Sequence, residues 1–388
     1  MKYDLTLLLN DDLTNLRSIF QQGGFDIRFV GGCVRDLLHG SVPHDTDLCT
    51  DATPDEQIAL YDVHNIRHIE TGLQHGTISV LMNDVLYEIT SLRTDVETDG
   101  RHAVVAYTKD WIKDLERRDF TMNAMSLDFD GNLLDPFNGK KDLEASAVRF
   151  VNDATTRIKE DYLRILRWFR FRGRFGLTNV DPKEGAAIAR CATGLNRVSK
   201  ERIWSELSKI VSGDNGYDLL YHMHNLGVAE MCGLPNSHYL HGAEKTKELS
   251  NVTRNHITLL VSQYGRSIID SLHLLKVSNN ELALAVWLSN HREIVSNEGP
   301  FFLMAVEGVS REWALELAAL QGMNPFDYAI LQEWVVPEFP VNGFDLIKLG
   351  MKPGPDYGNT IKMLKKKWAD SNYILKKEDL LKLINIPL

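Results

Sequence analysis

The sequence lacks the marks of a membrane, secreted or zinc-binding protein. None of its apolar runs approaches the roughly 20 residues that a bilayer-spanning helix needs. The first residues, MKYDLTLLLNDDL, are too acidic for a signal or transit peptide. The cysteines show neither CxxC nor paired spacing, which argues against zinc ligation and a disulfide framework; they are Cys33, Cys49, Cys191 and Cys232. We therefore expect a cytoplasmic protein with reduced thiols and no membrane association.

The charge of the chain is unevenly distributed. Net charge is −10, and an acidic chain is at first a poor candidate for binding nucleic acid. However, residues 1–100 contain 17 Asp and Glu but only 6 Lys and Arg. Residues 157–209 contain the opposite excess, with 6 Asp and Glu and 13 Lys and Arg. An acidic part that gathers metal ions, followed by basic helices that hold a polyanion, suits phosphoryl transfer on a nucleic acid. The lysines within residues 362–377 are, by themselves, better explained as a solvated helix face.

Hydrophobic periodicity predicts an α+β protein. The 388 residues are 44% hydrophobic and 25% charged, which predicts two or three domains of ordinary globular composition. Up to about residue 135, short β-like runs alternate with short helices, as in a small mixed sheet with helices packed on it. After about residue 140, amphipathic helical patterns dominate and no convincing strand appears. The expected strands are DIRFV, NIRHIE, GTISVLM, VLYEIT and MSLDF.

A pair of glycines follows the first expected strand, in RFVGGCVRD. Phe29 and Val30 end the strand, and the apolar spacing that follows predicts a short helix, so Gly31 and Gly32 lie at a strand-to-helix turn. Glycine lets the backbone approach an anion, and Arg35 one turn later adds a bidentate donor. The turn therefore suits a phosphate group, although for an isolated Gly-Gly a plain tight turn is the better explanation.

Two carboxylates stand one residue apart in HDTDL. Asp45 and Asp47 alternate along an expected strand, so both side chains point to one side. Paired carboxylates suit Mg²⁺, which keeps several waters and also takes phosphate oxygens of a substrate. Glu88 in LYEIT is either a third ligand of this catalytic metal site or an exposed residue of an edge strand.

The segment DLERRDFTMNAM combines charged and amide side chains before an apolar strand. Arg118 near the metal would stabilise a triphosphate, and its neighbour Asp119 would hold the guanidinium in place. Asn123 would bind a ribose hydroxyl. An ordinary capped helix end is the alternative.

The segment RIKEDYLRILRWFRFRGRFG, residues 157–176, predicts one helix with a charged ridge. The ridge recurs every three residues and comprises Asp161, Arg164, Arg167 and Arg170. An Asp acceptor beside an Arg donor complements the amino group and ring nitrogen of cytosine or adenine, whereas guanine and uracil present the opposite order. Asp161 and Arg164 would therefore select C and A without a nucleic-acid template. The alternative is a surface salt bridge between them.

Six motifs occur in the order and spacing found in the class II tRNA nucleotidyltransferases, the CCA-adding enzymes of the polymerase-β-like superfamily. The motifs are VGGCVRD, HDTDL, RRDFTMNAM, DPFNGKKDL, EDYLRILR and VSKERIWSEL. The resemblance is strong over roughly the first 210 residues, and NGFDLIKLGMKPGPDYGNTIKMLKKKW resembles the family's C-terminal segment. It implies a nucleotidyltransferase head (residues 1–140), a helical neck with a nucleotide-selecting helix (141–210), a helical body (211–335) and a helical, tRNA-binding tail (336–388).

The family's functional positions carry over motif by motif. The implied triphosphate, metal and nucleotide contacts are Gly32, Arg35, Asp45, Asp47 and Arg118. The implied base-reading pair is Asp161 and Arg164, with Arg167 and Arg170 as further nucleotide contacts and Glu201 and Arg202 in a fifth motif that supports the neck. LRTDVETDGRHAVVAYTKDW resembles the family's flexible loop, which helps the switch from C to A, although a hairpin end would also explain it. The expected loop residues are Asp95, Glu97, Gly100, Arg101 and His102.

The resemblance also implies the reaction and its partners. The 3′-hydroxyl of a tRNA lacking all or part of its CCA would attack the α-phosphate of CTP or ATP at a two-Mg²⁺ site and expel pyrophosphate. The protein is expected to be a monomer. The alternatives are a bacterial poly(A) polymerase, whose segment after the metal loop is richer in Arg and Lys than HIETGLQHGTISV, a CC-adding or A-adding specialist, and an RNA-binding protein with an inactive head.

Overall fold

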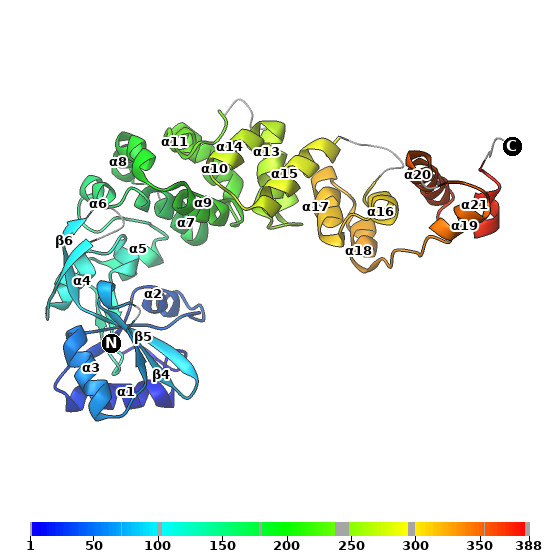
Figure 1. Cartoon of the computed structure of the whole chain (residues 1–388). Helices are drawn as coiled ribbons and strands as arrows, with labels where there is room; N and C mark the ends of the chain where they lie inside the picture. Colours follow the sequence, from blue (N-terminus) through cyan, green and yellow to red (C-terminus); the bar gives the residue numbers. More distant parts are fainter. Residues whose placement is uncertain are drawn as a thin grey trace. The chain divides into compact units, whose positions relative to one another are not determined.

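The chain folds as two compact units, Met1–Leu234 and Pro235–Leu388 (Figure 1). The structure is a computed structural model that describes residues 2–70, 72–98, 103–177, 181–236, 248–293, 299–352 and 354–384, with backbone only at 95–98, 103–104 and 355. The boundary between the units lies inside the segment expected to form the body, so the division into four parts stays a prediction.

A seven-stranded mixed sheet forms the centre of the first unit. Its strand order is β3-β4-β5-β2-β1-β8-β9. Strands β2 and β5 are parallel, and the other neighbouring pairs are antiparallel. The small mixed sheet expected from the sequence is thereby confirmed, and each expected strand overlaps an observed one. The strands are β1 (Ile27–Val30), β2 (Asp47–Thr50), β3 (His68–Ile69), β4 (Thr77–Met82), β5 (Val85–Ser91), β8 (Ser126–Leu127) and β9 (Leu133–Leu134).

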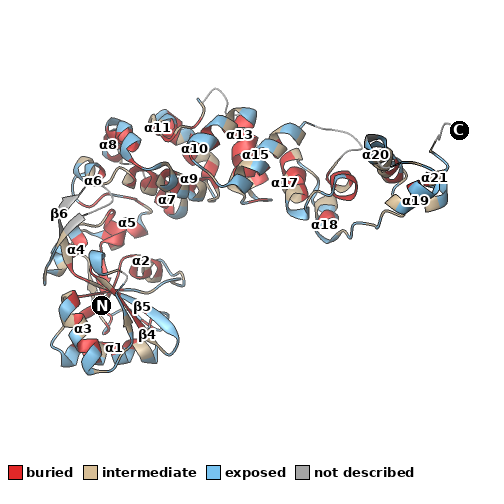
Figure 2. Ribbon diagram, in the orientation of Figure 1, coloured by how far each residue is buried: buried red, intermediate tan, exposed pale blue. Residues whose placement is uncertain are grey.

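Helices α1 (Asp11–Gln22) and α3 (Pro54–Val63) share an apolar core with the sheet (Figures 1 and 2). Phe20 and Tyr61 pack edge to face in this core, with ring centroids 6.0 Å apart. Thr53 and Glu56 form a reciprocal capping box that fixes where α3 begins. The core anchors β1 and β2, whose ends carry the glycine turn and Asp47.

Strands β6 (Arg93–Thr98) and β7 (Ala103–Tyr107) form a separate antiparallel ribbon. A bulge interrupts its register between Asp95 and Glu97. The backbone of these two residues therefore lies on a paired strand. The other expected loop residues, Gly100, Arg101 and His102, lie outside the described residues.

Helices follow the sheet, as the sequence predicts. The segment expected to form one helix over residues 157–176 is broken, because α6 ends at Glu160 and α7 begins at Arg164. Asp161 has an extended backbone at this break, so the single continuous ridge was a wrong prediction. Besides α1 and α3, the α-helices of the first unit are α2 (Gly32–Leu38), α4 (Trp111–Glu116), α5 (Gly139–Glu144), α6 (Ala154–Glu160), α7 (Arg164–Phe175), α8 (Pro182–Cys191), α9 (Lys200–Val211), α10 (Gly216–Asn225) and α11 (Val228–Cys232).

Within its described residues, the second unit consists of helices joined by irregular segments and contains no β-strand. Trp368, Leu364 and Leu346 are buried in one of its cores. No helix within the described ranges is both long and apolar enough to cross a membrane. The helices are α13 (His256–Tyr264), α14 (Ile268–Leu274), α15 (Asn279–His291), α16 (Pro300–Phe302), α17 (Arg311–Gln321), α18 (Pro325–Glu333), α19 (Gly343–Lys348), α20 (Pro355–Asp370) and α21 (Lys377–Leu381).

Candidate active site

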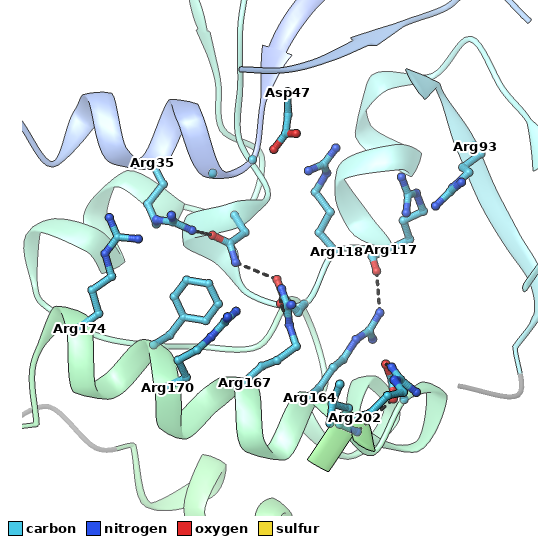
Figure 3. A pocket seen from close by; sticks show the side chains of 17 residues that line it. Arg35, Asp47, Arg93, Arg117, Arg118, Arg164, Arg167, Arg170, Arg174 and Arg202 are labelled. Carbon is cyan, nitrogen blue, oxygen red and sulfur yellow. Dashed lines mark hydrogen bonds and ion pairs between the residues drawn. The ribbon is translucent and has the colours of Figure 1, made fainter. Parts of the chain in front are cut away.

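A cavity of about 800 Å³ in the first unit, here called the main cavity, is walled chiefly by arginine (Figure 3). Arg118 and Asp47 reach it from the sheet side, and Arg164, Arg167 and Arg170 reach it from helix α7. The structure thus brings together residues from motifs more than 150 positions apart in sequence. The lining residues are Gly31, Gly32, Arg35, Asp47, Arg93, Arg117, Arg118, Asp119, Asn123, Asp161, Leu163, Arg164, Arg167, Arg170, Phe171, Arg174 and Arg202.

A smaller cavity of about 170 Å³ lies beside strands β2 and β5. It shares Asp47, Arg93, Arg117 and Arg118 with the main cavity, and Glu88 lines it from β5. These four shared residues therefore form the wall between the two spaces. We call it the strand-side cavity.

The glycine turn is built around Arg118. Gly31 has φ +68°, a conformation that side chains other than glycine rarely adopt, and a Cβ on it would lie 2.7 Å from Nη1 of Arg118. Gly32 begins α2, and a Cβ there would meet only ordinary contacts with Arg35 and Asp47. Gly31 is thus the position where the close approach of a guanidinium demands glycine.

The expected metal carboxylates lie near one another, but not all on one strand. Asp47 is the first residue of β2 and pairs in register with Glu88 of β5, so both side chains lie on one face of the sheet. Strand β5 lies between β4 and β2, so the reading of Glu88 as an edge-strand residue was wrong; it is nevertheless exposed. Asp45 precedes β2 in a bend, so the prediction that it lies on the strand was also wrong.

The electrostatics of Asp47 suit a cation. Partial withdrawal from water raises the pKa of its carboxyl, Arg118 opposes that rise, and the negative charges of Asp45 and Glu88 add to it. Within the described residues, no group of three or more His, Cys, Asp or Glu side chains is arranged to hold a metal by protein alone. A donor set of two carboxylates fits Mg²⁺, because that ion keeps waters and takes phosphate oxygens as further ligands.

Arg35 lines the main cavity from α2 and is held in place by several partners. It is 6% exposed, and its guanidinium donates to Oδ1 of Asp36 at 2.8 and 2.9 Å and to Oδ1 of Asn123 at 2.6 Å. The guanidinium also lies 5.0 Å from the ring centroid of Phe171. The role of Arg35 at a triphosphate stays a prediction, and its partners leave it little freedom to move towards a ligand.

Arg118 is held by Asp114, contrary to the expectation that Asp119 holds it. Oδ2 of Asp114 lies 3.2 Å from Nη2 of Arg118, and its Oδ1 lies 2.8 Å from Nη2 of Arg117. Asp114 lies on α4, three and four residues before the two arginines. This helical spacing was visible in the sequence and was missed.

Asp119 instead joins the sheet side of the cavity to α7. Its Oδ2 accepts from Nε and Nη2 of Arg167 at 2.7 and 2.6 Å, and its Oδ1 accepts from Nδ2 of Asn123 at 2.9 Å. Burial acts to raise the pKa of Asp119, but Arg167 and Asn123 outweigh it and hold the pKa below its usual range. Asn123 therefore bridges Arg35 and Asp119, and its proposed ribose contact stays a prediction.

Asp161 and Arg164 both line the main cavity, but each forms its ion pair with another described residue and not with the other. Asp161 Oδ2 accepts from Nη2 of Arg202 on α9 at 2.8 Å. Arg164 donates to Oε2 of Glu160 at 2.6 Å and to the carbonyl oxygen of Arg117 at 3.0 Å. The alternative of a surface salt bridge between Asp161 and Arg164 is therefore wrong, and Arg202 links the fifth motif directly to the expected base-reading pair.

Several site residues were missed by sequence reasoning. Arg174 lines the main cavity and pairs with Asp36 at 3.0 Å, and Arg170 pairs with Glu206 at 3.1 Å. Arg174 continues the basic face of α7 one turn beyond Arg170, so the helical pattern could have revealed it. The partner Glu206 lies on another helix and gave no local signal.

The sequence and the fold match proteins of one family. Residues 27–149 match the family described as "Poly A polymerase head domain", and residues 179–232 match "Probable RNA and SrmB- binding site of polymerase A". The "CCA tRNA nucleotidyltransferase 1, mitochondrial" of Danio rerio is 39% identical over 96% of this chain and 90% of its own length. The "CCA-adding enzyme" of Lactobacillus delbrueckii is 30% identical over 88% of this chain and 89% of its own.

A solved structure agrees with these relatives. The CCA-adding enzyme of Bacillus stearothermophilus, in complex with CTP, superposes with a TM-score of 0.73 at 27% identity, over 96% of this chain and 98% of its own. The match extends through both compact units and contains the sheet and the helical remainder. The chain belongs to the class II tRNA nucleotidyltransferases, the family of CCA-adding enzymes.

Proposed function

We propose that this chain adds C, C and A to the 3′ end of tRNA from CTP and ATP, without a template and with release of pyrophosphate. One observation carries the proposal: Asp161 and Arg164 line the same cavity as Asp47 and Arg118. A base-selecting pair and a nucleotidyl-transfer centre thus share one space. The relatives named as CCA-adding enzymes and the CTP complex of the Bacillus enzyme support the same conclusion.

Asp161 and Arg164 select the base of the incoming nucleotide. The carboxylate accepts the amino hydrogen of cytosine or adenine, and the guanidinium donates to the adjacent ring nitrogen. Arg202 fixes the carboxylate, and Glu160 fixes the guanidinium. Because both groups are already oriented by other side chains, little ordering is left to the moment of nucleotide binding. UTP and GTP would leave buried polar groups without partners and are rejected for that reason.

The residues around Asp47 catalyse nucleotidyl transfer. Asp45 and Asp47, with Glu88 as a neighbour, would hold a divalent metal, for which we propose Mg²⁺. When bound, such a metal would activate the attacking hydroxyl and neutralise the negative charge of the pyrophosphate that leaves. Arg118, beside Asp47, binds phosphate oxygens, and the arginines of α7 orient the nucleotide. No side chain forms a covalent bond to the substrate.

The helical remainder would bind the tRNA. We propose that residues 1–140 form the head, 141–210 the neck, 211–335 the body and 336–388 the tail. Helix α20 carries Lys362, Lys365, Lys366 and Lys367. Contacts by such lysines to the RNA backbone would be largely independent of sequence and sensitive to salt. We propose that the protein acts as a monomer, as the resemblance to the family implies.

The compartment is a separate part of the proposal. The expected cytoplasmic location stays a prediction, and the name of the Danio rerio relative favours the mitochondrion as the alternative. Fractionation of cells that express the full chain, probed with an antibody to it, distinguishes the two.

The decisive test uses tRNA transcripts that lack three, two or one of the final nucleotides. Each is incubated with CTP, ATP, UTP or GTP singly, and with CTP plus ATP, and the products are sequenced. A CCA-adding enzyme completes every transcript to CCA and stops. Long adenosine tails would indicate a poly(A) polymerase, CC or A products alone would indicate a specialist, and the absence of any product would indicate an inactive RNA-binding protein. The same assay with Mg²⁺ removed by a chelator and then restored tests the metal.

A further inference from the structure

Asp114 occupies a position from which three parts of the active site can be held at once. It lies on α4, and its side chain is completely buried, with 0% exposure. A buried carboxylate is costly unless charged or hydrogen-bonded groups surround it. Its known partners are the side chains of Arg117 and Arg118 and the backbone of Arg93.

The first two contacts reach the wall between the cavities. Arg117 donates to Oδ1 of Asp114 through Nε at 2.9 Å and Nη2 at 2.8 Å, while Arg118 donates to Oδ2 at 3.2 Å. Both arginines line the main cavity and the strand-side cavity. One carboxylate therefore spaces two guanidiniums beside Asp47 that would otherwise repel each other.

The third contact reaches the β6–β7 ribbon. The backbone N–H of Arg93, the first residue of β6, donates to Oδ1 of Asp114 at 3.3 Å. Arg93 pairs in register with Tyr107 at the other side of the ribbon's root, and its side chain donates to the carbonyl oxygen of His75. The root of the ribbon and the two arginines thus share one acceptor group.

We propose that Asp114 is a positioning residue, which places Arg117 and Arg118 for the nucleotide triphosphate and couples their placement to the root of the β6–β7 ribbon. A displacement of the ribbon shifts the carboxylate, and the carboxylate shifts both guanidiniums. The reverse also holds, because a coupling between two sites acts equally in both directions. The inference rests on the proposed function, since it assumes that a nucleotide occupies the main cavity.

The first test compares variants of one helix. Asp114→Asn removes the charge with little change in volume, and Asp114→Glu restores it one methylene further out. Asp110→Ala is the control, because Asp110 is exposed and caps the same helix by accepting a hydrogen bond from the N–H of Ile112. We expect Asp114→Asn to raise KM for both CTP and ATP by about ten-fold or more, with KM for tRNA unchanged. We expect Asp114→Glu to recover part of this loss and Asp110→Ala to lose thermal stability alone.

Equal nucleotide KM values for Asp114→Asn and Asp110→Ala, at matched loss of stability, would overturn the positioning role. Failure of the proposed function looks different, because the unaltered protein would then add no CCA at all. Direct binding of CTP, measured by calorimetry on the full chain, supports the inference if Asp114→Asn weakens it and contradicts the inference if the variant binds as tightly as the unaltered protein.

The second test addresses the coupling, and its first measurement uses only the unaltered protein. Saturating CTP should slow deuterium uptake by a peptide that contains the Arg93 amide, because occupied arginines hold the shared carboxylate more firmly. If CTP slows exchange elsewhere around the main cavity but leaves the Arg93 peptide unchanged, the coupling is wrong. In Asp114→Asn at saturating CTP, we expect the protection of that peptide to be lost.

Discussion

Gly31 and Arg118 approach so closely that a methyl group on Gly31 would force the guanidinium of Arg118 to move. A Cβ on Gly31 would lie 2.7 Å from Nη1 of Arg118, and the glycine also has a positive φ. The glycine of the strand-to-helix turn therefore makes room for a protein cation. This steric role is separate from the predicted approach of the backbone to a phosphate, which stays a prediction.

Gly31→Ala should impair nucleotide addition by displacing Arg118. We expect kcat/KM for CTP to fall by about a hundred-fold, as for a misplacement of about 1 Å at a reacting centre. Gly40→Ala is a matched control, because Gly40 also has a positive φ, of +80°, but a Cβ there would meet no atom within 4 Å. Both variants should lose about 1 kcal/mol of stability from backbone strain. Equal activity in the two variants would contradict the steric argument.

Asp47→Asn should abolish every addition while the fold and tRNA binding persist. Loss of an anionic ligand at the transfer centre should lower kcat by at least about a thousand-fold, or ~4 kcal/mol of transition-state stabilisation. Asp51→Asn serves as the control, because Asp51 follows the same strand and its carboxylate accepts from the backbone of Asp26 outside both cavities. A near-normal rate for Asp47→Asn, measured as single-nucleotide extension of a tRNA that ends in CC, would remove Asp47 from the catalytic centre.

Arg164→Ala should relax base choice. We expect discrimination against UTP, expressed as the ratio of kcat/KM for CTP and UTP, to fall by about ten-fold or more, because one of the two hydrogen bonds that read the base is lost. Arg174→Ala removes the same charge from the same helix and the same cavity, but Arg174 lies towards Asp36. It should weaken binding of both nucleotides and leave the ratio unchanged. An unchanged ratio in Arg164→Ala would mean that the base is read elsewhere.

Glu184 should make the stability of the first unit depend on pH. Its side chain is buried in the wall of a second cavity of about 820 Å³, Oε1 accepts from the N–H of Phe150 at 3.3 Å, and Oε2 has no hydrogen-bond partner among the described residues. Burial raises the pKa of Glu184 from 4.5 to about 7. The folded state therefore holds its proton more tightly than the unfolded state does. The associated stability is complete below pH 4.5 and is lost as pH rises through about 7.

Glu184→Gln should consequently be more stable than the unaltered protein at pH 8 and similar near pH 4.5. We expect the free energy of unfolding at pH 8 to rise by about 1 to 2 kcal/mol. The side-chain amide of the variant does not ionise, although one of its polar groups still lacks a partner. Urea unfolding followed by intrinsic fluorescence at several pH values measures it. Glu144→Gln, at an exposed side chain, is the control and should show no such dependence. A variant less stable than the unaltered protein at pH 8 would show that Glu184 stays paired when ionised.

Local patterns in the sequence predicted the elements of the site better than the partners of its side chains. The apolar run before Gly31 and the spacing after it predicted β1 and α2, because both depend on residues close in sequence. The position of Asp161 was predicted as helical, since three-residue spacing alone cannot reveal a break between two helices. Its partner Arg202 lies 41 residues away, and such a pairing depends on how α9 packs against α7.

The choice between Asp114 and Asp119 as the partner of Arg118 illustrates the same limit. Asp119 is adjacent in sequence, but adjacent residues on a helix or turn point in different directions, whereas Asp114 is one helical turn away. Asp119 was then available to Arg167, a contact that joins two separate motifs. The resemblance to a known family predicted the members of the site, and only the fold showed which of them contact one another.

The carboxylates behind the arginines give the main cavity a nearly balanced charge. Nine arginines line it, yet Asp47, Asp119 and Asp161 line it too, and Asp36, Asp114, Glu160 and Glu206 form ion pairs with its arginines. Such a space attracts a distant anion only weakly and recognises one mainly by fit at short range. The two substrates should therefore respond differently to ionic strength. Raising the salt concentration should weaken the binding of tRNA well before it weakens the binding of CTP or ATP.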